Sequence, residues 1–534
     1  MGEIRRAIPQ PVSISCQRSA QRRARAMKFE RSSGILLHPT SLPSPCGIGD
    51  LGPAAYRWID WLAGAGCKLW QVLPLGHTGY GDSPYQCFSA FAGNPYLISP
   101  EQLLQEGLLE DTDLRAAASF PSQRVDYGAL IPWKLTLLEK AFQRFLHQPS
   151  TRQAEFERFR QEQAAWLEDY ALFMALKEAY GGQPWTAWPE ALRQRQPQAL
   201  TQARRDLSHA VTRFAFYQYL FFQQWTALKT YANARGVRII GDVPIFVAHD
   251  SADVWANPHL FHLDRHGQPT VVAGVPPDYF SPSGQRWGNP LYRWEVHRAE
   301  GYGWWLARLR IALQMADFLR IDHFRGFAAC WEVPATESTA VNGRWVPGPG
   351  ADFFRAVQNA FHSEDDLPIL VEDLGEITPD VIALREQFHL PGTKVLQFAF
   401  TAPDNPFLPH NYTSRCVVYT GTHDNDTALG WYASVSDRER DFACRYLGRQ
   451  FSDAPAAPNS GEEDFAWAMI RAAWASVAVF ALAPMQDVLS LGTTARMNYP
   501  GRMGGNWEWR MDSEVLQAGF LQEKLRELNW LYYR

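Results

Sequence analysis

Eight short apolar segments rich in β-branched residues recur along the chain and constrain its fold more than any other feature. Each ends in a polar residue or a Gly/Pro cluster, which is typical of buried parallel strands. They begin at Gly34, Lys68, Val237, Asp317, Pro368, Lys394, Cys416 and Ala483. Helix-like segments separate most of them. Eight strands alternating with helices predict an α/β fold, a (β/α)8 TIM barrel.

One of the helix-like segments, "TPDVIALREQF", has a clear start signal. Thr378 is a residue type preferred at the N-cap, and Pro379 follows at the first helical position. We therefore expect a helix to begin at this point, between the fifth and the sixth strand.

The interval between the second and third strands is far longer than the others. Its sequence is mostly helical in character, as in "EQAAWLEDYALFMALKEAY". We expect a large, mainly helical insertion at about residues 100–235, carried by the barrel. On this interpretation residues 27–534 form one catalytic barrel, and the insertion is not a separate catalytic domain.

Residues 1–26 differ from the rest of the chain, with six arginines and a single acidic residue, Glu3. An Arg-rich, acid-poor start is typical of an organelle transit peptide. Met27 offers a second start, so an over-long gene start is the alternative. In either case we expect a disordered leader outside the fold. The predicted location is cytoplasmic, or plastid if residues 1–26 are a transit peptide.

Composition excludes some classes of function. The formal net charge is only -5, without a block of like charge in the body, which argues against a nucleic-acid partner. Seven scattered cysteines without a CxxC pair indicate a reducing compartment and argue against a cysteine zinc site. The most apolar run, "AAWASVAVFALAPM", is too short to cross a bilayer of about 30 Å, and it predicts a buried helix.

Acidic residues recur at the predicted C-terminal strand ends, where a TIM barrel places its active site. A single strand-end carboxylate often only caps a helix or binds loop amides. For the whole set, with arginine and histidine beside it, a catalytic role is favoured. The set comprises Asp242, Asp322, Glu372, the pair His423–Asp424, and Asp487.

Strand periodicity relates Arg320 to Asp322. The two residues are two apart, so their side chains point the same way. A guanidinium beside Asp322 favours the ionised carboxylate, which is the form that a covalent nucleophile at a sugar carbon requires. The alternative is a purely structural ion pair.

The neighbours Glu372 and Asp373 cannot both face the barrel interior, and the sequence does not decide between them. A second carboxyl near Asp322 would have a raised pKa, as a general acid needs. Two carboxyls about 5 Å apart would predict a retaining mechanism at a glycosidic bond. His423 could equally be a core histidine.

Two loops combine Gly/Pro turns with aromatic residues. They are "GYGDSPYQCFSAFAGNPY" after the second strand and "DYFSPSGQRWGNPLY" after the third. Tyr and Trp offer a flat apolar face together with a polar group, which suits loops that cover a sugar site. The alternative is that these loops simply pack on the barrel.

Long motifs in order carry a family resemblance. They are "ILLHPTSLPSPCGIGDLG", "GDSPYQCFSAFAGNPYLISP", "GDVPIFVAHDSADVWANP", "YFSPSGQRWGNPLY", "LRIDHFRGF", "VEDLG", "GTHDNDT" and "MNYPG". The chain resembles the 4-alpha-glucanotransferases of glycoside hydrolase family 77, also called amylomaltases or disproportionating enzymes. The resemblance runs from about Gly34 to the C-terminus and implies a (β/α)8 barrel with helical insertions.

The resemblance also implies a role for particular residues. Asp322 would be the nucleophile, Glu372 the acid/base and Asp424 the transition-state stabiliser. The implied substrate-binding residues are Tyr85, Asp242, Trp287, Arg320, His423 and Asn498. The implied reaction moves a segment of an α-1,4-glucan donor to the 4-hydroxyl of a glucose or glucan acceptor. It proceeds through a covalent glucosyl-aspartate with retention, without metal or organic cofactor.

Three alternatives stay open. A retaining α-glucan hydrolase would use the same carboxylates. A metal-dependent hydrolase would use adjacent pairs such as His249–Asp250, although neighbours on a strand point to opposite faces. A glucan-binding scaffold would have little reason to keep the costly charged set. The sequence carries no signal for an oligomeric state.

Overall fold

The computed structural model describes residues 29–277, 281–362, 366–449, 464–502 and 504–534. The predicted leader, residues 1–26, lies outside these ranges. So does the start of the second aromatic loop, at residues 278–280.

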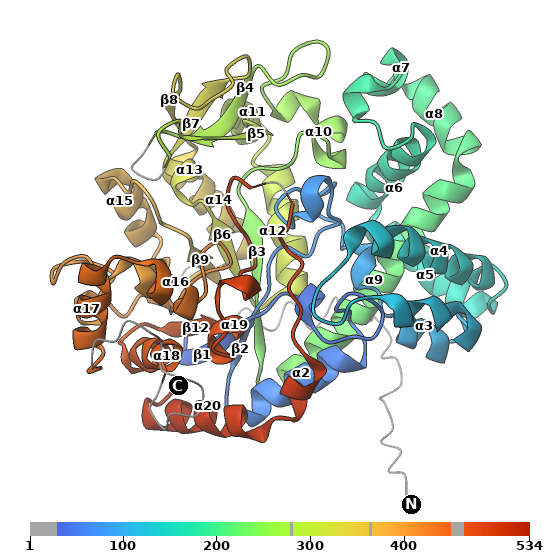
Figure 1. Ribbon diagram of the computed structural model, residues 1–534. Coiled ribbons are helices and arrows are strands. Elements are labelled where there is room, and N and C mark those ends of the chain that lie inside the picture. Colours follow the sequence, from blue (N-terminus) through green and yellow to red (C-terminus); the bar gives the residue numbers. More distant parts are fainter. Residues whose placement is uncertain (1–28, 278–280, 363–365, 450–463, 503) are drawn as a thin grey trace, which may run out of the picture.

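Eight parallel strands close into a barrel at the centre of the molecule (Figure 1). Around the barrel their order is β1-β12-β11-β10-β9-β6-β3-β2. The strands are β1 (Ser32–Leu36), β2 (Leu69–Gln71), β3 (Arg238–Pro244), β6 (Phe318–Asp322), β9 (Ile369–Val371), β10 (Gly392–Val395), β11 (Cys416–Tyr419) and β12 (Phe480–Pro484). The predicted (β/α)8 TIM barrel is confirmed.

The last strand corrects two predictions. The run "AAWASVAVFALAPM" is not one buried helix, because it is divided between the end of α18 (Phe465–Ala475) and strand β12. The segment predicted as the eighth strand from Ala483 contains only the end of β12, and its continuation forms α19 (Met485–Val488). Five buried residues of β12 provide enough extended chain to pair with β1 and β11.

Helices surround the barrel and extend to one side of it. Besides α18, those that come before the last strand are α2 (Pro53–Gly64), α3 (Pro100–Gln105), α4 (Tyr127–Phe145), α5 (Ser150–Glu162), α6 (Ala164–Ala179), α7 (Glu190–Arg193), α8 (Pro197–Asp206), α9 (Ser208–Ala234), α10 (Ala252–Ala256), α11 (Trp294–Ala299), α12 (Gly303–Met315), α13 (Arg325–Ala328), α14 (Gly350–Phe361), α15 (Pro379–Gln387), α16 (Ala428–Ser434) and α17 (Asp437–Tyr446). Helix α20 (Gly519–Leu531) ends the chain beside α2.

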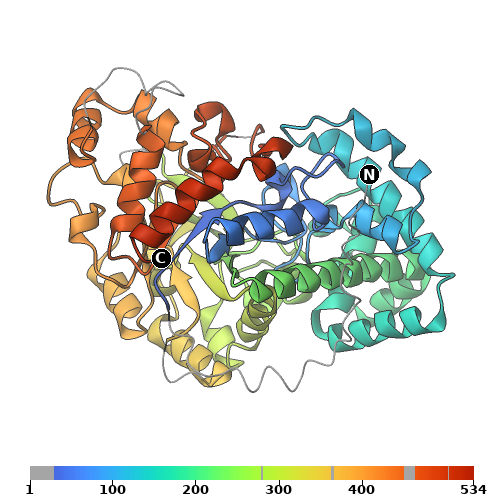
Figure 2. The same cartoon turned by 90° about the horizontal axis from the view of Figure 1, so that it is seen from below.

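The long segment between β2 and β3 contains α3 to α9. Helix α9 is 27 residues long and belongs to two parts of the structure. One part of it packs on α2 and β3 at the barrel, and it also packs on α4, α5, α6 and α8 (Figure 2). The helical insertion therefore has a continuous connection to the barrel wall.

A second sheet, which the sequence analysis did not predict, lies above the C-terminal end of the barrel in Figure 1. Its order is β5-β4-β7-β8, and its neighbouring strands are antiparallel. The strands are β4 (Val271–Val275), β5 (Gln285–Pro290), β7 (Ala329–Pro334) and β8 (Arg344–Pro347). Part of the second aromatic loop is thus strand β5.

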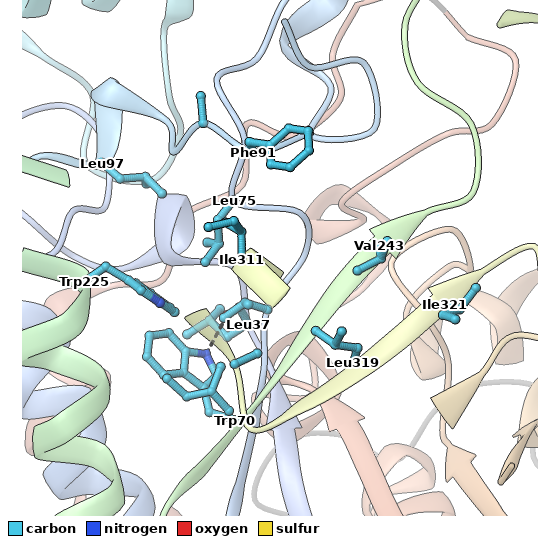
Figure 3. Close-up of a cluster of buried hydrophobic side chains, with 14 of the residues drawn as sticks. Leu37, Trp70, Leu75, Phe91, Leu97, Trp225, Val243, Ile311, Leu319 and Ile321 are labelled. Atoms are coloured by element: carbon cyan, nitrogen blue, oxygen red, sulfur yellow. Dashed lines mark hydrogen bonds between the residues drawn. The ribbon is translucent and has the colours of Figure 1, made fainter. Parts of the chain in front are cut away.

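The two faces of each barrel strand pack against different partners. Leu319 and Ile321 of β6 and Val243 of β3 face the helices, in one cluster with Trp70 of β2 and Trp225 of α9 (Figure 3). The Trp70 indole N–H donates a 2.7 Å hydrogen bond to the main-chain oxygen of Leu37. This outer cluster fixes which face of β3 and β6 points inward.

The inward face changes from apolar to charged along the barrel axis. Ile240 and Phe318 lie in a buried interior cluster near the N-terminal strand ends. Two residues further along the same strands come Asp242 and Arg320, and Asp322 ends β6. Because alternate residues of a strand share a face, the apolar layer supports the charged layer above it.

No helix in the part of the chain that the structure describes is both long enough and apolar enough to span a membrane.

We predict that Phe480→Ala destabilises the protein strongly. Phe480 is 1% exposed, and its ring packs edge-on against Phe318 with centroids 5.1 Å apart. Truncation of such a ring costs about 3–5 kcal/mol of unfolding free energy. The thermal midpoint measures it. Phe520→Ala is the matched control because Phe520 is 67% exposed. Equal midpoints for the two variants would contradict this packing.

Candidate active site

Charged side chains from β3, β6 and the segment after β9 meet at the C-terminal end of the barrel. Asp242 and Arg320 are register partners on the neighbouring strands β3 and β6. Asp322 is the last residue of β6, and Glu372 directly follows β9. The parallel register therefore brings together residues that are up to 130 positions apart in the sequence.

Arg320 bridges two carboxylates. Its Nη1 lies 2.7 Å from Oδ2 of Asp242 and 3.0 Å from Oδ1 of Asp322. The predicted common direction of Arg320 and Asp322 is confirmed, whereas the contact with Asp242 was not foreseen. Although burial acts to lower it, the charges of Asp242 and Asp322 hold the pKa of Arg320 well above its usual value.

Asp242 anchors the bridge in the barrel, since its side chain has no exposed surface. Oδ2 also accepts a 2.8 Å hydrogen bond from the hydroxyl of Tyr85. Burial raises the pKa of Asp242, with a further contribution from Asp322, and the charge of Arg320 opposes this rise. The more exposed Asp322, at 27%, is the carboxylate of the pair that a ligand can reach.

The structure resolves the choice between Glu372 and Asp373. Oε2 of Glu372 accepts a 2.7 Å hydrogen bond from the main-chain N–H of His323, the neighbour of Asp322. The carboxylate of Asp373 instead faces Arg385 at 2.5 Å and accepts from the main-chain N–H of Thr393. Glu372 is therefore the residue of this pair that lies beside Asp322.

The acid–base properties of Glu372 are strongly altered. Burial, together with the negative charge of Asp322, raises its pKa to about 8. The charge of Arg320 and the hydrogen bond from His323 oppose this rise without cancelling it. At neutral pH Glu372 can therefore hold a proton, while the carboxylate of Asp322 lies 3.0 Å from the guanidinium of Arg320.

Aromatic rings cover the opposite side of this charged layer. The ring of Tyr85 stacks on His423, with centroids 5.0 Å apart and planes 16° apart. Trp507 lies 5.9 Å from both rings. Trp507 was not predicted, although it lies six residues after the "MNYPG" motif. His38, which lines the same pocket as His423, was not predicted either. Burial, with a contribution from His423, lowers the pKa of His38 to about 3.

Asp424 and Asn498 form a more open part of the site. Oδ1 of Asp424 accepts a 2.6 Å hydrogen bond from Nδ2 of Asn498, and it lies 3.4 Å from Nε2 of His423. Its main-chain oxygen accepts from Arg496 at 2.6 Å. The carboxylate is 49% exposed, so it is held in place yet open to a ligand.

Trp287 reaches the site from β5 in the second sheet. Its ring meets His323 edge-on, with centroids 4.8 Å apart. His323 has a left-handed backbone with φ of 50°, and burial lowers its pKa to about 4. The N–H of His323 donates to Glu372 while its ring contacts Trp287, so the second sheet touches the charged layer.

Asp487 does not join the site. It lies in α19, and its carboxylate accepts hydrogen bonds from Oγ1 of Thr420 at 2.5 Å and from the main-chain N–H of Ala428 at 2.7 Å. Its side chain is fully buried, and burial raises its pKa to about 6. The residue has the structural role that any strand-end carboxylate can have, binding a loop and a helix start.

The pair His249–Asp250 attaches the loop after β3 to the insertion. Asp250 lies 2.5 Å from Nζ of Lys177, and the main-chain oxygen of His249 accepts from the indole of Trp185. Nowhere in the described ranges do three or more His, Cys, Asp or Glu residues form a group suited to a metal ion.

A closed (β/α)8 barrel with paired carboxyl groups and an arginine at its C-terminal strand ends has the architecture of a carboxylate-dependent enzyme acting on glycosidic bonds. A family model described as "4-alpha-glucanotransferase" matches residues 37–516. The chain therefore belongs to the 4-alpha-glucanotransferase family, glycoside hydrolase family 77.

Individual relatives are similar along most of their length. A 4-alpha-glucanotransferase of Thermus thermophilus is 56% identical over 91% of this chain and 95% of its own. A chloroplastic/amyloplastic 4-alpha-glucanotransferase of Solanum tuberosum is 44% identical over 94% of this chain and 86% of its own. The solved amylomaltase of Streptococcus agalactiae in complex with acarbose has a TM-score of 0.89 and 39% identity, covering 95% of this chain and 100% of that one.

The raised pKa of Glu372 predicts a pH-dependent stability. Its pKa is about 8 in the folded protein and about 4.5 when unperturbed, so the folded state binds this proton more tightly. The stabilisation is complete below about pH 4.5 and is lost as the pH rises through about 8. Between pH 5 and 8 the thermal midpoint of the wild type should fall relative to that of Glu372→Gln, which cannot ionise.

The exposed Glu527 provides the control, because Glu527→Gln should follow the wild-type curve across this range. Parallel curves for the wild type and Glu372→Gln would show that Glu372 titrates alike in the folded and unfolded states.

Proposed function

We propose that this chain transfers a segment of an α-1,4-glucan to the 4-hydroxyl of a glucose or glucan acceptor by a retaining double displacement. The observation that best supports this proposal is that Arg320 pairs with both Asp242 and Asp322 while the neighbouring Glu372 has a raised pKa. This arrangement supports two neighbouring carboxyl groups in opposite protonation states, which a nucleophile and a general acid require.

In the first step, Asp322 attacks the anomeric carbon of the donor. Glu372 gives its proton to the glycosidic oxygen, so the leaving glucan departs with a free 4-hydroxyl. The glucosyl group becomes an ester of Asp322. Arg320 holds Asp322 ionised and in one orientation until the bond forms, and Asp242 keeps Arg320 in place from below.

In the second step, the 4-hydroxyl of an acceptor replaces the leaving glucan. Glu372, now ionised, takes the hydroxyl proton while the acceptor oxygen attacks the anomeric carbon. Asp322 leaves as a carboxylate, and the second inversion restores the original α configuration. If water reacts instead, the outcome is hydrolysis on the same site.

The surrounding residues would bind the sugars. Asp424, open to a ligand and fixed by Asn498, would stabilise the positive charge that develops at the anomeric carbon. Tyr85, His423, Arg320 and Asp242 would contact the sugar being transferred. Trp287 and Asn498 would shape the acceptor side, which for Trp287 agrees with its contact with His323.

Maltotriose alone distinguishes transfer from hydrolysis. Transfer makes longer chains and glucose while the number of reducing ends stays constant. We expect this result when oligosaccharide lengths and total reducing ends are followed together. A steady rise in reducing ends would show a hydrolase, and an absence of any change with maltotriose and longer donors would favour a glucan-binding scaffold.

Asp322→Asn should abolish transfer while leaving the fold intact. The substitution keeps the shape of the side chain and removes only the nucleophilic charge, so we expect a loss of at least about 10⁴-fold in kcat. The thermal midpoint and the far-ultraviolet circular dichroism spectrum report the fold. Near-normal activity in a preparation free of wild-type enzyme would remove Asp322 from this role.

A further inference from the structure

Arg325 is a buried cation next to the proposed catalytic residues. It begins α13, three residues after Asp322, and is only 5% exposed. Its Nη1 donates to the main-chain oxygen of Glu376 and, at 3.1 Å, to Oγ1 of Thr378. Its guanidinium carbon lies 3.7 Å from the ring centre of Trp345 in β8.

These contacts join the segment after β6 to the segment after β9. The first segment directly follows Asp322, the last residue of β6, and the second runs from Glu372 to Thr378. Helix α13 also packs against α15 and β7, so this helix lies where the barrel, the second sheet and α15 meet (Figure 1).

Main-chain hydrogen bonds fasten the same two segments at their inner end. The N–H of Glu372 donates to the oxygen of Ile321, and the N–H of Phe324 donates to the oxygen of Glu372, both at 2.9 Å. The N–H of His323 binds the Glu372 carboxylate itself. Arg325 links the same two segments further from the barrel, where these main-chain hydrogen bonds end.

The side chain of Thr378 binds Arg325 in place of the usual N-cap hydrogen bond to its own helix. Its backbone is extended and Pro379 follows, as predicted for an N-cap. Its side chain, however, makes no capping hydrogen bond to α15, and its hydroxyl instead accepts from Arg325. The start of α15 is thereby tied to the segment that directly follows Asp322.

The arrangement is costly for a structural contact alone. Burial lowers the pKa of Arg325, and the charges of Glu376 and Asp380 oppose this without cancelling it. The guanidinium also contacts a carbonyl, a hydroxyl and the face of an indole, a combination that a planar guanidinium satisfies and an ammonium does not.

We propose that Arg325 is a positioning residue that fixes Glu372 relative to Asp322 by fastening the two segments at their outer end. The proposal rests on the proposed function, because it assigns no chemistry to Arg325 itself. Loosening the fastening should let the Glu372 segment move outward, so that Glu372 is both misplaced and less buried.

Several charged or titratable groups lie near Glu372 and contribute to its titration, which the pH dependence of kcat reports. They are Asp322 and Arg320 on β6, His323 after β6, Asp373 beside it, and Tyr419 on β11. Arg325→Lys keeps the positive charge, so an effect of this variant on the titration of Glu372 would come through position.

The test compares Arg325→Lys with Arg344→Lys in the disproportionation of maltotriose. Arg344 lies on β8 beside Trp345, but its side chain is 77% exposed and pairs with Glu332. For Arg325→Lys we expect kcat to fall about 10- to 100-fold, as for a small misplacement of a catalytic group, with KM changed less than about 2-fold. In the pH profile of kcat, the decline on the alkaline side should move to lower pH, because a less buried Glu372 has a lower pKa. Arg344→Lys should change none of these quantities.

Thr378→Val removes the hydroxyl, which accepts from Arg325 and also bonds to Asp380, and provides a milder variant if Arg325→Lys fails to fold. It should shift the alkaline limb in the same direction by a smaller amount. The proposal is overturned if folded Arg325→Lys keeps the wild-type kcat and alkaline limb, if its loss lies wholly in KM, or if Thr378→Val leaves the limb unmoved. Failure of the proposed function would appear separately, as activity that survives Asp322→Asn.

Discussion

The ion pairs of Arg320 with Asp242 and Asp322 are the interaction on which the site depends. Two carboxylates in a barrel interior would each be costly without a cation, and removal of one member of such a buried group costs about 3–5 kcal/mol. The bridge is possible because β3 and β6 are neighbours in register, so that Asp242 and Arg320 lie side by side. Asp322, two residues after Arg320 on β6, lies at the more open end of the barrel.

The charged layer also needs the apolar layers beneath and around it. Ile240 and Phe318 fill the interior below, while Trp70 and Trp225 fix the outer face of the same strands. Above it, the second sheet brings Trp287 against His323. The same barrel geometry that buries Glu372 beside Asp322 thus raises its pKa, so packing and acid–base chemistry have one cause.

Periodicity and motif order predicted the barrel, the common direction of Arg320 and Asp322, and, except for Asp487, the charged residues that the strands bring together. They did not predict the β5-β4-β7-β8 sheet, whose strands are short and whose central pairing, between β4 and β7, is non-local. The choice of Glu372 over Asp373 depended on Arg385 and Thr393. Trp507 reaches Tyr85 only through the fold of the C-terminal segment, and no local pattern signals that contact.

The central claim is that Asp322 forms a covalent bond with the transferred glucan. Glu372→Gln incubated with α-maltotriosyl fluoride tests it most directly, because fluoride leaves without a strong acid and the missing base slows the second step. Mass spectrometry of the intact protein and of its peptides should show one added maltotriosyl group on the peptide that contains Asp322. An adduct on another residue, or complete turnover without any adduct in this variant, would contradict the account.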